Sequence, residues 1–212
     1  MDRGIAKKVG HSSYAPDEAR RAGAPASVRI IAGRLRGRKL AQVPHEGVRP
    51  TPDRVREALF NILGQNLAGM AVLDLFTGTG AVGLEAASRG AQRVVLVDQD
   101  EQACETCRQN VRMLQEAQKV TVMRAEALQA LQRLGGEGRT FDVVFADPPY
   151  AQSLESLQQL VERVEGTGVL AADGTFVLQM KRGRPAPQTR ALEAERPRHY
   201  GITSIWIYER PT

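Results

Sequence analysis

Short apolar runs typical of β-strands alternate with amphipathic stretches typical of helices along most of this 212-residue chain. Because strands separated by helices cannot pair as simple hairpins, the alternation predicts an α/β fold with a mostly parallel sheet. The length suits one main hydrophobic core with a small appendage. The predicted strands are 71–75, 93–98, 120–123, 141–146 and 175–180, and the predicted helices lie near 81–89, 100–116, 125–134 and 153–164.

Both ends of the chain depart from this alternation. Residues 189–196 and 202–209 read as strands with no helix between them, so they predict a C-terminal antiparallel hairpin that brings the sheet to seven strands. Residues 28–41 combine two strand-like runs with turn glycines, which predicts a small N-terminal β-hairpin.

A helix is predicted between the N-terminal hairpin and the first strand of the sheet. Thr51 suits its N-cap and Pro52 its first position, and apolar residues then recur at helical spacing until Gly64 ends the helix. Hairpin and helix together predict a small extension, residues 27–66, ahead of a catalytic-sized domain, residues 67–212.

Positive charge is concentrated near the N-terminus. Residues 1–56 hold 13 Lys and Arg against 5 Asp and Glu, whereas the rest of the chain holds 16 against 19. A basic arm attracts phosphate backbones, although surface arginines can also serve solubility alone. Residues 1–26, rich in Ala, Gly, Arg and Pro, predict a disordered basic tail. The candidate nucleic-acid contacts are Arg34, Arg36, Arg38, Lys39 and Arg54.

Other features argue against a membrane protein, a disulfide framework and a metal protein. The longest aliphatic run, 94–97, is far shorter than the ~20 apolar residues that span a bilayer, and the first ten residues lack the apolar part of a signal peptide. Cys104 and Cys107 are the only cysteines, and no second pair or nearby histidine completes a metal site. We therefore expect a cytoplasmic protein with two helix-packing thiols and no metal.

The first two predicted strands end in residues suited to a nucleoside ligand. Asp74 lies at the end of the first strand. The loop that follows, Gly78-x-Gly80-x-x-Gly83, lets the backbone approach a ligand closely. Asp98, at the end of the second strand, can accept hydrogen bonds from ribose hydroxyls. Because this spacing also satisfies the dinucleotide fingerprint, the loop alone leaves an NAD site open.

Two features favour S-adenosylmethionine over a dinucleotide. Asp74 could hold a cationic methionine ammonium group, whereas it would repel a pyrophosphate. The tetrapeptide Asp147-Pro148-Pro149-Tyr150 follows the fourth strand and offers a rigid acceptor with a flat ring for stacking. In open α/β sheets ligands bind outside the carboxyl ends of the strands, so loop and tetrapeptide would share one crevice.

With these motifs the chain resembles the Rossmann-like class I methyltransferases and, among them, the RsmD family of small-subunit (16S) ribosomal RNA guanine-N2 methyltransferases. The resemblance runs from about residue 28 to residue 210. Its most discriminating part is the block 49–61, since many amino-methyltransferases share the other motifs. The matching segments are 29–33, 36–40, 49–61, 74–80, 147–150 and 200–201.

The resemblance implies S-adenosylmethionine as the cofactor and a role for particular residues of this chain. Asp147, Pro148 and Tyr150 would form the acceptor site. The basic side chains named above would contact ribosomal RNA, in the 30S subunit or an assembly intermediate, and the short chain is compatible with a monomer. The cofactor-binding residues would be Asp74, Phe76, Gly78, Gly80, Asp98 and Glu126.

Two positions depart from the family pattern. Phe76 stands where methyltransferase loops often carry a glycine, although amino-methylating members accept phenylalanine there. Lys181 follows the fifth strand, where an acidic residue is expected at the lip of the substrate pocket.

The predicted reaction is transfer of a methyl group to the exocyclic N2 of guanine. Asp147 and the carbonyl of Pro148 would accept the two amino hydrogens while Tyr150 stacks on the flipped base, and orientation would supply most of the rate. Three alternatives remain open. They are a DNA adenine-N6 methyltransferase, which usually needs a larger target-recognition domain, an NAD-dependent oxidoreductase, and a non-catalytic RNA-binding assembly factor.

Overall fold

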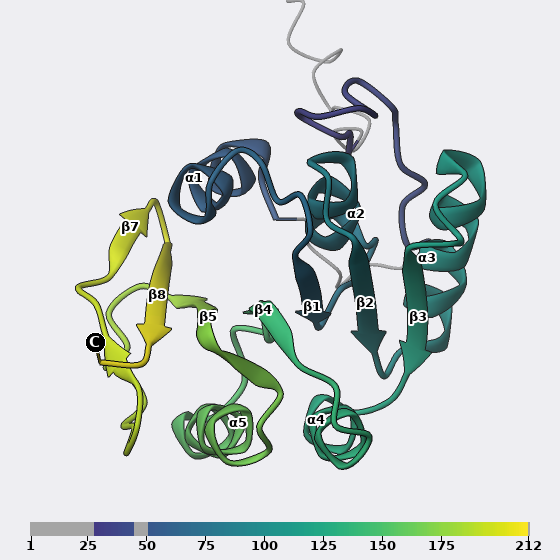
Figure 1. Cartoon of the computed structure of the whole chain (residues 1–212). Helices are drawn as coiled ribbons and strands as arrows, with labels where there is room; N and C mark the ends of the chain where they lie inside the picture. The colour runs from purple at the N-terminus through teal and green to yellow at the C-terminus, as the bar shows by residue number, and fades with distance from the viewer. Residues whose placement is uncertain (1–27, 45–50, 212) are drawn as a thin grey trace, which may run out of the picture.

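The structure, a computed structural model, describes residues 28–44 and 51–211, which fold around one central sheet (Figure 1). The predicted tail, residues 1–26, lies outside the described residues, as do Arg49 and Pro50 of the block 49–61.

An eight-stranded sheet forms the centre of the fold. Its strands are β1 (Ala71–Leu75), β2 (Arg93–Asp98), β3 (Val120–Arg124), β4 (Phe141–Ala146), β5 (Leu170–Lys181), β6 (Glu193–Ala194), β7 (Arg198–Tyr200) and β8 (Thr203–Glu209). They follow the order β3-β2-β1-β4-β5-β8-β6, and β7 also pairs with β8. Strands β1 to β5 are parallel, whereas β8 is antiparallel to its neighbours. Because β1 lies between β2 and β4, the strand ends that carry the predicted site are adjacent.

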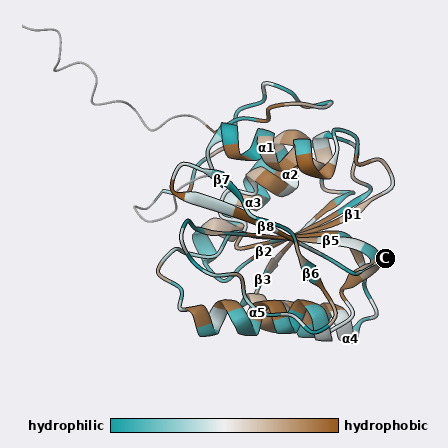
Figure 2. Ribbon diagram, turned by 90° about the vertical axis from the view of Figure 1, so that its left-hand side faces the viewer, coloured by the Kyte–Doolittle hydropathy of each residue, from teal (hydrophilic) through white to brown (hydrophobic). Residues whose placement is uncertain are grey.

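Helices cover both faces of the sheet. They are α1 (Asp53–Leu63), α2 (Ala81–Ser88), α3 (Glu101–Leu114), α4 (Ala127–Gly136) and α5 (Leu154–Gly166). Figure 2 shows α1, α2 and α3 on one face and α4 and α5 on the other. Each face has its own hydrophobic cluster, and side chains alternate between them along β1, with Val72 in the first and Leu73 in the second. Within residues 28–44 and 51–211 no helix has the length and apolar character needed to cross a bilayer.

The predicted Rossmann-like α/β fold is confirmed, with two differences in the strands. Strand β5 begins at Leu170 rather than at residue 175 and shows a register irregularity against β4. The predicted strand 189–196 is wrong in extent, because only Glu193–Ala194 of it is a strand, β6, and a further short strand, β7, pairs with β8 beyond the predicted span. Pro197 lies between β6 and β7, and its missing N–H cannot continue a ladder. The sheet therefore has eight strands instead of seven.

The N-terminal hairpin packs against the sheet domain. Its two arms meet at an antiparallel bridge between Arg29 and Lys39, and the Ile30 amide donates to the Arg38 carbonyl at 2.9 Å. Ile30 and Leu40 are buried in the same cluster as α1 and α2. The hairpin therefore shares a hydrophobic core with the sheet.

The predicted start of α1 is wrong by one residue. Pro52 occupies the N-cap position, without a side-chain cap, and the helix begins at Asp53. The Thr51 hydroxyl, expected to cap the helix, donates instead to Asp147 at 2.8 Å. Gly64 ends the helix as predicted, with a φ of 96° that favours glycine.

Candidate active site

Asp74 is a buried carboxylate near the end of β1, and one of its two oxygens lacks a hydrogen-bond partner. Its Oδ2 accepts hydrogen bonds from the Thr77 hydroxyl at 2.7 Å and from the Gly83 amide at 2.9 Å, while its Oδ1 has no partner. Burial raises the pKa of Asp74 to about 7, and the charges of Asp147 and Asp98 add to the effect. A buried acceptor oxygen without a partner suits a cationic ligand group, such as the ammonium of S-adenosylmethionine.

The loop after β1 turns sharply, and this turn brings its backbone toward the Asp74 carboxylate. Phe76 has a φ of 59°, and Gly78 and Gly80 have φ values of 55° and 80°. A residue with a side chain pays on the order of 1–2 kcal/mol in this left-handed region. This explains why a glycine is common at the position of Phe76, whose ring packs against the hydrophobic cluster on the α4 side.

Gly83 lets α2 lie close against the sheet. A Cβ at Gly83 would lie 2.2 Å from Leu96 Cδ2, 3.0 Å from Val94 Cγ1 and 3.2 Å from the Asp74 carboxylate. The glycine therefore serves two purposes, since it permits close packing of α2 and gives its amide to Asp74.

Asp98 and Glu126 lie at the ends of the next two strands. Asp98 accepts from the Gly78 amide at 2.9 Å and from the Asp100 amide at 3.0 Å, so it holds the glycine loop in place. Glu126 is exposed just before α4 and makes no capping hydrogen bond to it. With Asp74 they form a row of carboxylates across β1, β2 and β3, which fits a cofactor that carries an ammonium, a ribose and an adenine.

Asp147, the first residue of the predicted acceptor site, directly follows β4. The register sets Ala146 beside Leu178, so Asp147 comes next to Gln179 of β5. Burial raises the pKa of Asp147 to about 6, while hydrogen bonds from Thr51 and Gln179 act in the opposite direction. The carboxylate is therefore ionised at neutral pH and can accept hydrogen bonds.

Tyr150 is held at both its backbone and its ring. Its hydroxyl bonds to the Thr203 hydroxyl at the start of β8, and its carbonyl accepts from Arg184 Nη2 at 2.9 Å. Arg184 also bonds to the carbonyl of Gln152 and so ties down the turn after Pro149. These contacts fix the hydroxyl end of the Tyr150 ring and the backbone of the turn that carries it.

Cys104 and Cys107 are fully buried on the inner side of α3. The Cys107 thiol donates to the Gly78 carbonyl at 3.2 Å and the Cys104 thiol to the Asp98 carbonyl at 3.3 Å. Burial raises the pKa of both thiols, so they support the loop as neutral packing groups. In the described part of the chain, no three His, Cys, Asp or Glu side chains meet as metal ligands would.

The basic side chains predicted to bind nucleic acid fall into two groups. Arg34 pairs with the buried Glu116, and Arg38 donates to the Met113 carbonyl at 2.8 Å, so both tie the hairpin to the end of α3. Arg36 and Lys39 are exposed on the same hairpin. Arg54 is exposed on α1, where it borders a hollow of about 530 Å³ that Arg198 and Tyr200 also line.

The sequence analysis does not identify several residues of the site. It predicts Thr51 as a helix cap, and no local sequence pattern marks Gln179, Arg184 or Thr203. Their roles depend on neighbours far away in the chain, with Thr51 and Asp147 separated by 96 positions.

The chain matches known proteins over most of its length. The family described as conserved hypothetical protein 95 matches residues 28–209. The chain belongs to this family. The protein named ribosomal RNA small subunit methyltransferase D of Escherichia coli K12 is 35% identical to it, over 86% of this chain and 90% of the relative. The protein of the same name from Haemophilus influenzae is 33% identical, over 88% and 95%.

Solved structures agree with these sequence matches. The structure named "Putative methyltransferase yhhF" from Escherichia coli superposes with a TM-score of 0.73 at 33% identity, covering 87% of this chain and 98% of that one. The predicted RsmD family resemblance and the methyltransferase fold are thereby confirmed.

Proposed function

We propose that this protein transfers a methyl group from S-adenosylmethionine to the N2 amino group of a guanine in 16S ribosomal RNA. The relatives and solved structures named as methyltransferases support a methyltransferase that uses S-adenosylmethionine. The names of the relatives from Escherichia coli and Haemophilus influenzae support small-subunit ribosomal RNA as the substrate. One observation supports an amino group as the methyl acceptor. It is the Asp147 carboxylate, which accepts from Thr51 and lies close to Asp74 and its glycine loop.

The residues at the ends of β1, β2 and β3 bind S-adenosylmethionine and orient it. Asp74 Oδ1 receives the ammonium group, Asp98 the ribose hydroxyls, and Glu126 lies near the adenine. Gly78 and Gly80 allow the backbone to approach, and Phe76 closes the turn. Bound S-adenosylmethionine supplies an electrophilic sulfonium methyl group.

The acceptor site makes guanine N2 a better nucleophile. The nitrogen lone pair is delocalised into the ring until the two amino hydrogens are held and the nitrogen is biased toward tetrahedral geometry. The Asp147 carboxylate and the Pro148 carbonyl accept those hydrogens, and the ring of Tyr150 stacks on the extruded base, which contributes ~1–3 kcal/mol in comparable settings.

No strong base is required in this reaction. The amino group becomes acidic as the new N–C bond forms, so an acceptor with a pKa of about 6 is sufficient to take the proton. Most of the rate then comes from alignment of nitrogen, methyl carbon and sulfur.

The N-terminal part of the chain holds the RNA. Residues 27–66 carry the basic hairpin and α1, and residues 67–212 carry the catalytic crevice. The five basic side chains, with Arg36, Lys39 and Arg54 the most available, would contact phosphates of ribosomal RNA in the 30S subunit or an assembly intermediate. The protein would act in the cytoplasm as a monomer.

Methyl transfer from tritiated S-adenosylmethionine tests this function. Free 16S ribosomal RNA, 30S subunits and duplex DNA are offered separately, and the acceptors are digested to nucleosides. We expect label in N2-methylguanosine from an RNA substrate; label in N6-methyladenine of DNA would overturn the proposal. The Asp147→Ala variant serves as the control, since it removes the acceptor oxygens and should lose transfer while binding the cofactor in calorimetry.

A further inference from the structure

The acceptor carboxylate is contacted by a residue from outside the sheet domain. Thr51 lies just before α1, and its hydroxyl donates to Asp147 Oδ2 at 2.8 Å. The Thr51 hydroxyl does not cap α1, because no side chain caps the start of this helix. We propose that Thr51 is a positioning residue for methyl transfer, which orients the Asp147 carboxylate toward the amino group of the substrate. This inference rests on the proposed function of Asp147.

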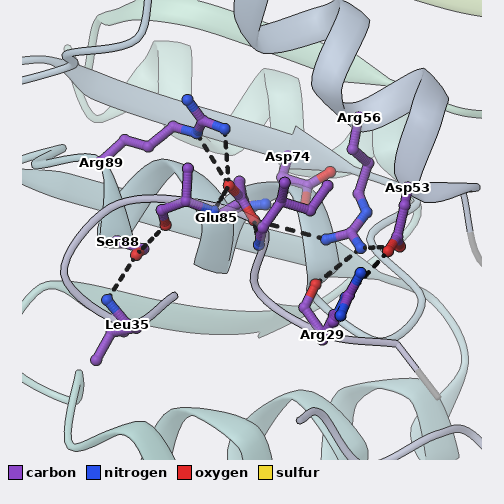
Figure 3. A network of polar contacts seen from close by, with 11 residues as sticks. Arg29, Leu35, Asp53, Arg56, Asp74, Glu85, Ser88 and Arg89 are labelled. Atoms are coloured by element: carbon purple, nitrogen blue, oxygen red, sulfur yellow. Dashed lines mark hydrogen bonds and ion pairs between the residues drawn. The ribbon is translucent and has the colours of Figure 1, made fainter. Parts of the chain in front are cut away.

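A buried ionic network fixes the first turn of α1 and therefore the position of Thr51. Arg56 is fully buried, and its Nη2 donates to Asp53 Oδ1 at 2.7 Å and to the Arg29 carbonyl at 2.8 Å. Its Nη1 lies 3.7 Å from Glu85 of α2 (Figure 3). The start of α1 is thus joined to both the hairpin and α2.

The hydrogen bond has a geometric consequence. A carboxylate can rotate about its Cβ–Cγ bond, and a donor fixed on Oδ2 restricts that rotation. Gln179 holds the same carboxylate from β5. Donors from Thr51 and Gln179 together fix the plane of the Asp147 carboxylate, and its remaining lone pairs can accept from a substrate amine.

The hydrogen bond also has an electrostatic consequence. Burial raises the pKa of Asp147, and the hydrogen bonds from Thr51 and Gln179 oppose this. The charged group on the neighbouring strand is Asp74, whose pKa is raised in part by the like charge of Asp147. Loss of the Thr51 donor should therefore raise the pKa of Asp147 and remove the ionised acceptor at higher pH than in the natural protein.

The experiment compares Thr51→Val, which keeps the shape and removes the donor, with Thr51→Ser, which keeps the donor. Thr121→Val, an exposed threonine on β3, is the matched control. For each protein we would measure kcat and KM for RNA over pH 5 to 9, cofactor binding, and the pKa of Asp147 by carbon NMR of the labelled carboxyl group. The natural protein and variants are used as full chains.

We expect Thr51→Val to lower kcat by about tenfold or more, with a larger loss at pH 6 than at pH 8 and with little change in KM or cofactor binding. The pKa of Asp147 should rise, and Thr51→Ser should restore both kcat and the pH profile. The inference is overturned if the pKa of Asp147 does not rise, or if kcat falls equally at every pH without rescue by serine.

These readouts separate this inference from the proposed function. A wrong nucleoside product would overturn the guanine assignment, while the pKa of Asp147 in the free protein still decides whether Thr51 controls the carboxylate. A melting temperature unchanged by Thr51→Val would exclude misfolding as the cause of lost activity.

Discussion

Asp74 and Asp147 are carboxylates at the ends of neighbouring strands, and their hydrogen-bond partners differ. Asp74 has one oxygen with two donors and one oxygen with none, and its pKa is raised to about 7. Asp147 has donors from Thr51 and Gln179, and its pKa is raised less, to about 6. Burial raises the pKa of both groups, and the donors from Thr51 and Gln179 favour the ionised form of Asp147, which can accept hydrogen bonds.

Cofactor affinity should therefore increase with pH through the range where Asp74 titrates. In the free protein the raised pKa means that Asp74 holds a proton below about pH 7. Binding of an ammonium group favours the ionised form, so one proton is released and the affinity rises by up to about tenfold per pH unit below that value. Calorimetric titration with S-adenosylmethionine from pH 5.5 to 8.5 measures this dependence.

Asp74→Asn is the matched variant for this prediction. It should bind the cofactor more weakly and without the slope, because it has no proton to release. A slope that persists in Asp74→Asn would show that another group is responsible.

At the scale of elements, α2 depends on a glycine where it crosses the sheet. In Gly83→Ala the new Cβ would meet Leu96 at 2.2 Å, so α2 must move away from β2. We expect the free energy of unfolding to fall by about 1–3 kcal/mol, as in other overpacked cores, and cofactor binding to weaken because the Gly83 amide leaves Asp74. Urea denaturation and calorimetry measure the two effects.

Gly136→Ala is the control for this change. A Cβ at Gly136, at the end of α4, meets nothing within 4 Å. This substitution should be neutral or slightly stabilising, by less than about 1 kcal/mol. Equal losses in the two variants would contradict the packing argument.

Some basic residues of the hairpin attach it to α3, whereas others are exposed to solvent. Arg34 and Arg38 bind the end of α3, whereas Arg36 and Lys39 are exposed. The double variant Arg36→Ala with Lys39→Ala should weaken RNA binding and reduce the slope of log affinity against log salt by roughly 1.5. RNA-binding assays from about 50 to about 300 mM salt measure this slope.

Arg133→Ala with Arg163→Ala removes the same charge from the opposite face, on α4 and α5. This control should leave the salt slope unchanged. If both double variants lowered the slope equally, the effect would come from net charge and the hairpin would lose its role.

At the scale of the molecule, the buried network around Glu85 joins the N-terminal part to the sheet. Glu85 accepts from the Ile31 and Ala32 amides at 2.6 and 2.8 Å and pairs with Arg89 at 2.9 Å, and it faces Arg56 (Figure 3). Hairpin, α1 and α2 also share one hydrophobic cluster. The described segments should therefore unfold as one cooperative unit.

Glu85→Gln should lower the free energy of unfolding by about 3–5 kcal/mol, because it removes the carboxylate that pairs with the buried Arg89 and faces the buried Arg56. Urea denaturation followed by circular dichroism measures this loss. Glu137→Gln, which breaks an exposed pair with Arg133, should change stability by less than about 1 kcal/mol. Separate transitions for the hairpin and the sheet in the natural protein would argue against a single unit.

Much of the fold could be predicted because local patterns carry it. The strands 71–75, 93–98 and 141–146 agree with the structure at both ends, since their apolar runs are bounded by turns and polar residues. The boundary errors came where local signals compete. Thr51 and Pro52 both suit a helix start, and of the predicted strand 189–196 only Glu193–Ala194 pairs with β8.

The sequence by itself determined the parallel α/β sheet, the glycine loop after β1 and the order of acidic residues at strand ends, because periodicity and turn chemistry act between near neighbours. Only the tertiary structure decided which distant side chains meet. Thr51 and Gln179 reach Asp147, Arg184 and Thr203 hold Tyr150, and Arg56 approaches Glu85. Those contacts depend on how helices and strands pack, and packing joins residues that no local pattern relates.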